Sequence, residues 1–220
     1  MSGNRGAPVR RSAVSHPIFA RGYQRLSLAE EAAGGAAHRE RLLAGLHGRV
    51  VEIGAGNGLN FGHYPQDVTE VFAVEPEPYL RSRAVKAAGG TPVPVTVTDG
   101  TADAVPLPDA SVDAGVVSLV LCSVPVQATA LAELRRVIRP GGELRFYEHV
   151  LADDARLARY QRRADHVWPW FAGGCHLARP TASAISAAGF EIVDCEQFVF
   201  PPYWVARLSA NHILGRAVRR

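Results

Sequence analysis

Three glycines at alternate positions follow an apolar stretch near residue 50, and they are the first feature of the sequence that could do chemistry. Residues 50 to 58 read Val-Val-Glu-Ile-Gly-Ala-Gly-Asn-Gly, so that Glu52 precedes Gly54, Gly56 and Gly58. Glycine has no side chain, which permits a tight turn and lets a ligand approach the backbone. The apolar residues before the glycines predict a buried strand. The segment therefore predicts a ligand cradle at the end of a strand.

A carboxylate stands at the end of the next predicted strand. Residues 71 to 74 are apolar, and Glu75 and the turn-forming Pro76 follow them. A carboxylate at this spacing from a glycine loop can accept hydrogen bonds from both hydroxyls of a ribose. The two features together predict a nucleoside pocket at the carboxyl edge of an α/β sheet. The spacing G-x-G-x-G differs from the dinucleotide pattern G-x-G-x-x-G, but by itself it leaves a dinucleotide open.

The rest of the chain alternates between apolar strands and helices, which predicts the elements that position this pocket. The last two strands have only a short connection between them, so we expect them to pair antiparallel. The fold class predicted is α/β, a Rossmann-like, seven-stranded, mostly parallel sheet with helices on both faces and an antiparallel last strand. Strands are predicted at 50–53, 71–74, 93–97, 112–119, 143–147, 190–200 and 211–218, and helices at 59–64, 78–88, 127–138, 153–168 and 181–188. The N-terminus of the helix at 59–64 would favour a negatively charged group of the ligand.

Length and composition indicate one globular domain with an N-terminal extension. The 220 residues are 47% hydrophobic and 20% charged, which suits a single domain with a full core. Residues 1–14 contain mostly Gly, Ser, Arg and other residues with little apolar character, and they predict a disordered basic tail. Residues 15–48 predict two cap helices separated by Gly34 and Gly35, and residues 49–220 predict the α/β domain.

Charge and cysteine content argue against several functional classes. The net charge is +3, and much of the excess lies at the two ends of the chain, so we expect solvated tails and no nucleic-acid partner. No stretch approaches the roughly 18 apolar residues of a membrane span, so no transmembrane segment is expected. Cys122, Cys175 and Cys195 are widely spaced and form no C-x-x-C pair, which predicts neither a zinc site nor a disulfide framework. A cytoplasmic location fits these cysteines.

The segment after the third predicted strand resembles a known family. Residues 99–113 read Asp-Gly-Thr-Ala-Asp-Ala-Val-Pro-Leu-Pro-Asp-Ala-Ser-Val-Asp, similar to the G-D-A-E-x-L-P-F-x-D-x-S-F-D segment of type 11 methyltransferases. The G-x-G-x-G loop resembles the first motif of the same class I S-adenosylmethionine-dependent enzymes. Thr101 replaces the family's Asp, and its hydroxyl would accept a hydrogen bond from adenine more weakly. The resemblance implies S-adenosyl-L-methionine as cofactor, S-adenosyl-L-homocysteine as product, and cofactor contacts from Glu52, Gly54, Gly56, Gly58, Glu75, Pro76, Thr101, Ala102, Ser118 and Leu119.

A closer resemblance is to the methyltransferase-like 7 family, which includes animal thiol methyltransferases. Leu119 to Val124, Leu134 to Gly142 and Glu148 to Val150 look like segments of that family, and residues 168–179 resemble its W…D-G-C-x-L-x-R segment. The resemblance implies methyl transfer to a small molecule, with a thiol as the first expectation. Animal members begin with a hydrophobic anchor that this sequence does not show, so we expect a soluble relative.

Other functions remain open at this stage. The same core looks like bacterial phospholipid N-methyltransferases, so a phospholipid or other small-molecule amine is the alternative acceptor. A non-catalytic nucleoside-cofactor-binding module is an alternative from another class. An NAD-dependent oxidoreductase is disfavoured by the glycine spacing and by residues 99–113. The oligomeric state and the accepting atom are not indicated by the sequence.

The sequence says least about the residues that bind the methyl acceptor. A thiol must lose its proton before it attacks, and a free thiol has a pKa of about 8.5, so a base would help near neutral pH. His149, at the end of a predicted strand, is the candidate base, and a hydrogen-bonded structural histidine is the alternative reading. Residues expected at the substrate pocket are His16, Phe19, Tyr23, Cys122, Trp168, Trp170 and His176, of which the aromatic ones could equally belong to the core.

Overall fold

Seven strands form one sheet in the order β3-β2-β1-β4-β5-β7-β6 in the computed structural model, which describes residues 17–200 and 204–220. All neighbouring strands pair in parallel except β7, which runs antiparallel to both β5 and β6. This arrangement confirms the predicted fold class. The predicted tail at 1–14 and His16 lie outside the described residues. The strands are β1 (Gly48–Ile53), β2 (Val68–Val74), β3 (Val95–Thr98), β4 (Val112–Ser118), β5 (Ile138–His149), β6 (Phe190–Val199) and β7 (Asn211–Arg219).

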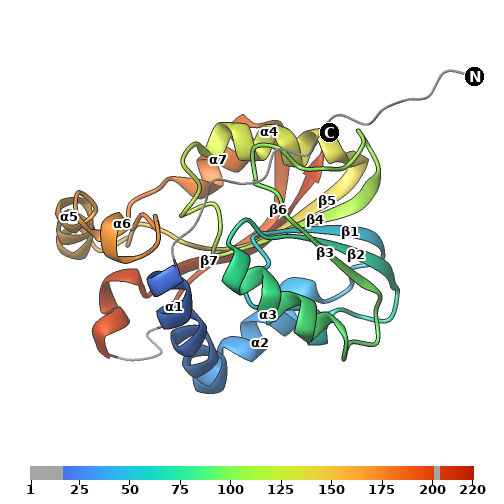
Figure 1. The fold of residues 1–220 in the computed structure, drawn as a ribbon. Coiled ribbons are helices and arrows are strands. Elements are labelled where there is room, and N and C mark those ends of the chain that lie inside the picture. The colour runs from blue at the N-terminus through green and yellow to red at the C-terminus, as the bar shows by residue number, and fades with distance from the viewer. Residues whose placement is uncertain (1–16, 201–203) are drawn as a thin grey trace, which may run out of the picture.

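Helices cover both faces of the sheet, as Figure 1 shows. Those on one face are α1 (Pro17–Glu30), α2 (Ala36–Leu43) and α3 (Pro78–Ala88), and those on the other are α4 (Gln127–Val137) and α7 (Thr181–Ala187). Two further helices, α5 (Ala155–Ala164) and α6 (Trp168–Phe171), lie together at one end of the molecule. No helix in the described ranges is both long enough and apolar enough to cross a membrane.

Two apolar cores lie on the two faces of the sheet, because successive side chains of a strand point in opposite directions. In β1, Val50 packs into the core beneath α2 and α3, whereas Val51 packs into the core beneath α4 and α7. Val116 and Val117 of β4 divide in the same way. All four side chains are fully buried, as expected for central parallel strands covered on both faces.

The prediction of a helix at 59–64 was wrong. The structure has only a short 3-10 turn there, Phe61–His63, so no helix N-terminus stands behind the glycine loop. Tyr64 precedes Pro65 and adopts an extended conformation, φ −65° and ψ 130°, which is the conformation that a following proline favours. The glycine loop therefore offers its own backbone groups to a ligand, without a helix dipole.

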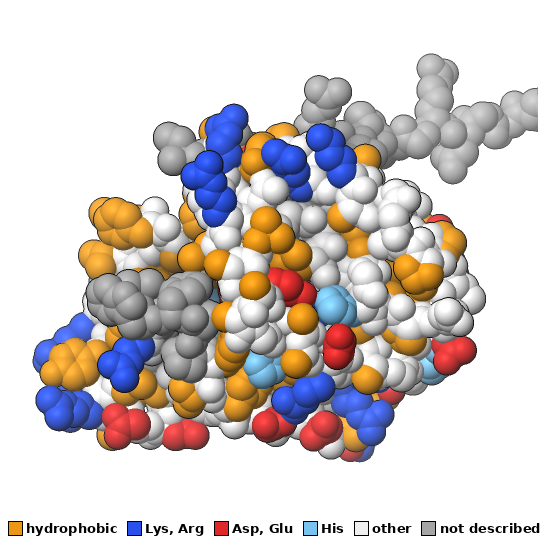
Figure 2. All heavy atoms as spheres, turned by 90° about the horizontal axis from the view of Figure 1, so that it is seen from below, with side chains coloured by type: hydrophobic (Ala, Val, Ile, Leu, Met, Phe, Trp, Pro, Cys, Tyr) orange, Lys and Arg blue, Asp and Glu red, His pale blue; other side chains and the backbone are white. Residues whose placement is uncertain are grey.

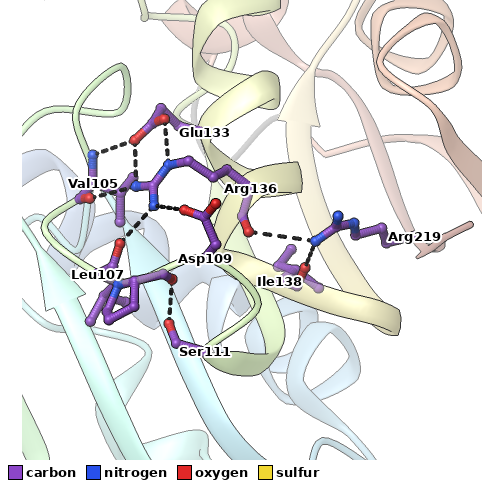
Figure 3. A network of polar contacts seen from close by, with 9 residues as sticks. Val105, Leu107, Asp109, Ser111, Glu133, Arg136, Ile138 and Arg219 are labelled. Atoms are coloured by element: carbon purple, nitrogen blue, oxygen red, sulfur yellow. Dashed lines mark hydrogen bonds and ion pairs between the residues drawn. The ribbon is translucent and has the colours of Figure 1, made fainter.

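The segment between β3 and β4 is attached to α4 by Arg136 and Glu133, shown in Figure 3. Arg136 donates hydrogen bonds to the carbonyl oxygens of Val105 and Leu107 at 2.9 and 2.8 Å. Its guanidinium also pairs with Glu133 at 2.8 Å and with Asp109 at 2.7 Å. The backbone of the family-like segment is thus held by the following helix.

Candidate active site at the carboxyl edge of the sheet

The glycine loop follows β1 and adopts a backbone conformation that glycine alone adopts easily. Gly54, Gly56 and Gly58 have φ angles of 66°, 58° and 84°. A Cβ on Gly54 would lie 2.5 Å from the side chain of Val120, and one on Gly58 would lie 2.8 Å from the Phe61 ring. Packing therefore requires the outer two glycines. At Gly56 the nearest atom is 3.7 Å away, on Tyr23 of α1, so this backbone faces the space under α1.

Glu75 closes the other side of the cradle from the end of β2. Its Oε2 accepts a hydrogen bond from the backbone N–H of Gly56 at 2.7 Å, and its Oε1 accepts one from Glu77 at 2.9 Å. Burial raises the pKa of this carboxyl group, although the two N–H donors oppose the shift. A carboxylate has about four acceptor sites, so about two remain for the hydroxyls of a ribose. The carboxylate and the adjacent backbone fit a nucleoside.

Glu52, in β1, stabilises the segment that follows the glycine loop. Its two carboxylate oxygens accept hydrogen bonds from Asn60 Nδ2 at 2.9 Å and from the Tyr64 hydroxyl at 2.7 Å. Burial raises the pKa of Glu52 to about 7, while these two hydrogen bonds act in the opposite direction. Arg39 of α2, itself buried, donates to Asn60 Oδ1 at 2.8 Å. This network connects the cap helices to the loop, and Arg39, Asn60 and Tyr64 are site residues that the sequence did not indicate.

The remaining predicted cofactor residues lie along the same edge of the sheet. Ser118 ends β4, and its Oγ accepts a hydrogen bond from Arg39 at 3.3 Å. Leu119 has a left-handed φ of 60°, a strained conformation for a bulky residue, and its N–H donates to the Tyr147 carbonyl at 2.7 Å. Thr101 follows β3, where its carbonyl accepts a hydrogen bond from the backbone N–H of Ala104. Ala102, next to Thr101, packs against the apolar core, and Pro76 follows Glu75 with its carbonyl bonded to Arg81.

Glu148 shapes the loop that follows β4. It is fully buried, and it accepts hydrogen bonds from the backbone N–H groups of Val120, Leu121 and Cys122 at 3.0, 2.8 and 3.0 Å. Burial raises the pKa of Glu148, and the three donors counteract part of that effect. Sequence reasoning noticed this glutamate only as the neighbour of His149. Its position between β5 and the loop makes it the group that holds Cys122 in place.

Two cysteines and one histidine meet beside this loop. His149 Nδ1, at the end of β5, lies 3.7 Å from Cys122 Sγ and 3.4 Å from Cys175 Sγ. Burial lowers the pKa of His149, but the neighbouring Cys175 sulfur outweighs this effect and leaves the pKa raised. A hydrogen bond from Cys122, together with His149, holds the pKa of Cys175 well below its ordinary range. The two predicted residues, Cys122 and His149, therefore come together with a third, Cys175, for which no role was expected.

Helix α1 lies over the space between the glycine loop and this cluster. Phe19 and Tyr23 stack with ring centroids 5.8 Å apart. Tyr23 faces Gly56, and Phe19 packs so closely on Gly173 that a Cβ there would lie 2.3 Å from the ring. Ser27 accepts a hydrogen bond from Asn57 of the glycine loop at 3.1 Å. The stacked pair thus spans the distance from the cofactor side to the segment that carries Cys175.

The other predicted pocket residues differ in their placement. Trp170 is 82% exposed and does not wall a pocket, because the short helix α6 turns this side of the chain toward solvent. Trp168 is partly buried, and its Nε1 is buried without a hydrogen-bond partner among the described residues. His176 pairs through Nδ1 with Asp165 at 2.9 Å, and its N–H donates to the Cys122 carbonyl at 2.8 Å. His176 therefore anchors the Cys122 loop.

The surface near these elements is not uniformly basic. Figure 2, which views the molecule from below, shows positive, negative, histidine and apolar side chains mixed over one face. Several arginines form ion pairs, such as Arg49 with Glu70 at 3.6 Å and Arg81 with Asp99 at 3.2 Å. The polar groups described above converge on the glycine loop and the loop after β4, beneath Tyr23 and Phe19 of α1.

Comparison with known proteins agrees with this geometry. The family model described as a methyltransferase domain matches residues 51–146. Thiol S-methyltransferase TMT1B from Homo sapiens is 34% identical over 184 residues, which cover 80% of this chain and 74% of that protein. Thiol S-methyltransferase TMT1A from Homo sapiens is 32% identical over 174 residues, covering 77% of this chain and 70% of that protein.

Solved structures show the same fold. A SAM-dependent methyltransferase from Thermotoga maritima, titled a possible histamine N-methyltransferase, has a TM-score of 0.67 and 23% identity over 92% of this chain and 98% of its own. A geranyl diphosphate methyltransferase in complex with SAM has a TM-score of 0.67 and 14% identity, covering 86% of this chain and 85% of its own. Fold, domain match and relatives agree, and the chain belongs to the S-adenosylmethionine-dependent methyltransferases, in the family of the thiol S-methyltransferases TMT1A and TMT1B.

Proposed function

We propose that this enzyme transfers the methyl group of S-adenosylmethionine to the sulfur of a small-molecule thiol. The identity to thiol S-methyltransferases extends over 80% of the chain, well beyond the matched methyltransferase domain at 51–146. A continuous match of that length must include His149 and Trp168, on the acceptor side. The sequence match thus extends beyond the residues of the cofactor site, and this is the observation that supports a thiol acceptor most directly.

The cofactor half of the site has a role for each group. Glu75 would accept hydrogen bonds from the ribose hydroxyls, and the backbone from Gly54 to Gly58 would lie against the cofactor. Thr101 and Ala102 are proposed for the adenine, and Ser118 and Leu119 border the same space. When bound, the cofactor supplies an electrophilic methyl carbon on a sulfonium. The protein's task is to align the acceptor with that carbon, which can be worth several kcal/mol.

The acceptor half has to deliver a thiolate, since the thiolate is the nucleophile. His149 is partly exposed and lies at the same sheet edge as Glu75 and Ser118, with its Nδ1 beside the Cys122 and Cys175 sulfurs, so we assign it to the acceptor side of the site. The stacked rings of Phe19 and Tyr23 lie over the glycine loop and Gly173, where they would limit the access of water to a bound acceptor. A small apolar thiol suits these surroundings better than a charged acceptor does.

An amine is the second candidate acceptor. Dimethylglycine N-methyltransferase from Parasynechococcus marenigrum is 29% identical over 126 residues, which cover 54% of this chain and 44% of that protein. The match is shorter and weaker than the matches to the thiol enzymes. We therefore rank an amine second, and the following experiment separates the two.

The test is a panel of acceptors with methyl-labelled S-adenosylmethionine. Alkyl thiols, aryl thiols, amines and phenols are each incubated with the full chain and with a Glu75→Ala variant as a cofactor-site control. We expect label on thiols with the unchanged chain only. Label on amines and none on thiols would replace the proposal with the amine alternative. Cofactor binding without transfer to any acceptor would favour the non-catalytic module.

A further inference from the structure

Three side chains from distant parts of the sequence present sulfur and nitrogen atoms to one point. Cys122 follows β4, His149 ends β5, and Cys175 follows α6. Their ligand atoms, two Sγ and one Nδ1, all lie within 4.8 Å of one another. Cys122 and Cys175 are buried and unpaired. The cysteines are widely spaced in the sequence, which is why no metal site was predicted there. The fold brings them together with His149.

The distances match those between the ligands of a tetrahedral zinc ion. With Zn–S near 2.3 Å and Zn–N near 2.0 to 2.1 Å, the nitrogen-to-sulfur edge of a tetrahedron is about 3.6 Å. The observed separations from His149 Nδ1 are 3.7 Å to Cys122 Sγ and 3.4 Å to Cys175 Sγ. Both nitrogen-to-sulfur separations therefore lie within about 0.2 Å of the tetrahedral edge, and the two sulfurs lie within 4.8 Å of each other.

The backbone holds the two cysteines in this arrangement. The N–H of Cys122 donates to the buried Glu148 at 3.0 Å, and its carbonyl accepts from His176 at 2.8 Å. Cys175 follows Gly173 and Gly174, whose φ angles of 60° and 89° produce the turn that returns the chain. A Cβ on Gly174 would lie 3.0 Å from the Ser123 carbonyl, so the two cysteine-bearing loops are in direct contact. The two loops are therefore already in position, and little conformational ordering is needed when a metal ion binds.

The ligand set selects the metal. Two thiolates and one imidazole form a soft donor set that suits Zn²⁺ and disfavours Mg²⁺ and Ca²⁺, which prefer oxygen. Two thiolates balance the charge of one divalent ion, and the fully buried Glu148 adds negative charge nearby. Arg179 is the neighbouring cation, and its guanidinium is directed to the carbonyls of Leu121 and Val124. Three protein ligands are also the number found in zinc sites that keep a position open for chemistry.

We propose that Cys122, His149 and Cys175 bind one Zn²⁺ ion, and that its fourth position takes the acceptor thiol. The second part rests on the proposed function. The site is close to the cofactor cradle, because Val120, two residues before Cys122, packs on Gly54. The stacked pair of Phe19 and Tyr23 bridges from Gly173 to Gly56 on the other side.

The chemistry balances without a change of oxidation state. On binding to the ion, the thiol releases its proton to water, because coordination lowers the pKa of a thiol strongly. A lone pair of the acceptor sulfur forms the new bond to the methyl carbon. The bond between that carbon and the cofactor's sulfur breaks, and its electron pair stays on that sulfur. In this arrangement His149 holds the ion through Nδ1, and the ion replaces it as the group that generates the thiolate.

The experiment measures metal binding by the full chain, kept reduced and freed of metal by a chelator. Zn²⁺ is titrated and bound metal is quantified, and Co²⁺ is substituted to observe thiolate-to-metal absorption. We expect one Zn²⁺ per chain and a cobalt spectrum of thiolate coordination. Cys122→Ser and Cys175→Ser should weaken Zn²⁺ binding by more than about 100-fold. Cys195→Ser is the matched control, because Cys195 is exposed on β6.

Each outcome decides a separate point. No metal uptake by the reduced, folded chain would overturn the metal site, and so would equal affinity in Cys122→Ser and Cys195→Ser. The cobalt spectrum of the unchanged chain decides the question even where a variant fails to fold. Thiol methylation at the same rate with and without Zn²⁺ would overturn the open fourth position while leaving the proposed function intact. Zn²⁺ binding without any thiol methylation would overturn the proposed function while leaving the metal site.

Discussion

Replacement of Glu75 by Gln tests the cofactor cradle at its most specific contact. Glu75 is 4% exposed and uses one oxygen on Gly56 N–H and the other on Glu77 N–H. Gln has nearly the same size but lacks the charge, and its NH₂ group would face one of the two N–H donors. The variant therefore changes the electrostatics of the cradle and leaves its volume almost unchanged.

The magnitude follows from the two ribose hydroxyls that the carboxylate would accept. Hydrogen bonds to a charged group contribute about 1.5–3 kcal/mol and neutral ones about 0.5–1.5 kcal/mol, so each hydroxyl should lose roughly 1–1.5 kcal/mol. The sum of about 2–3 kcal/mol raises the Kd for S-adenosylmethionine about 30- to 150-fold. The assay is isothermal titration calorimetry with S-adenosylmethionine and with S-adenosylhomocysteine.

The matched control is Glu77→Gln. Glu77 is similarly buried, but its carboxylate accepts the N-cap hydrogen bond from Leu80 N–H at 2.8 Å, away from the glycine loop. This variant should lose stability and keep the cofactor Kd within about threefold, because the Glu77 carboxylate caps helix α3 and acts on Glu75 only through its charge. A Kd for Glu75→Gln within threefold of the unchanged chain would refute the assignment of the ribose to Glu75.

Three further variants test the supports of the site. Glu52 has a pKa raised to about 7 by burial, so the folded chain holds its proton more tightly than the unfolded chain, and this contribution to stability is present below about pH 4.5 and is lost as the pH rises through 7. The unchanged chain should therefore lose up to about 3 kcal/mol of unfolding free energy between pH 5 and 8, and Glu52→Gln should not show this loss. The measurement is urea unfolding at each pH, and the same pH dependence of the unfolding free energy in both proteins would contradict it. Arg136→Ala should cost about 2–4 kcal/mol in urea unfolding, because it removes the hydrogen bonds to two loop carbonyls and the ion pairs with Glu133 and Asp109, whereas the exposed Arg156→Ala should cost less than about 0.5 kcal/mol; equal losses would contradict the role shown in Figure 3. Gly173→Ala places a Cβ 2.3 Å from Phe19, so adding Phe19→Ala should restore about 1 kcal/mol or more of the loss, and strictly additive losses would rule out the contact.

The sheet could be predicted from sequence because its signals are local. The apolar runs of β1, β2 and β4 and the glycines behind β1 mark the strands and the loop without reference to the rest of the chain. The helix expected at 59–64 failed for a non-local reason. Tyr64 donates its hydroxyl to the buried Glu52, and Pro65 favours the extended conformation that this contact needs. The cofactor contacts themselves stay predictions from family resemblance.

The supporting network could not be predicted, because it joins residues that are far apart in the sequence. Arg39 lies in a helix where an arginine is expected to be exposed, yet it is buried against Asn60 and Ser118. Cys175 became visible as a partner of Cys122 only when the turn at Gly173 and Gly174 was known. Side-chain clusters of this kind depend on tertiary contacts, which periodicity and spacing do not encode.

The accepting atom is the central claim, and one measurement addresses it directly. The enzyme is given S-adenosylmethionine with a ¹³C-labelled methyl group and 2-aminothiophenol, which carries a thiol and an amine on the same ring. Carbon NMR distinguishes a methyl carbon on sulfur from one on nitrogen, and the two groups compete within one acceptor molecule at the same concentration. The account predicts the S-methyl product. A product methylated on nitrogen, with sulfur unchanged, would contradict it.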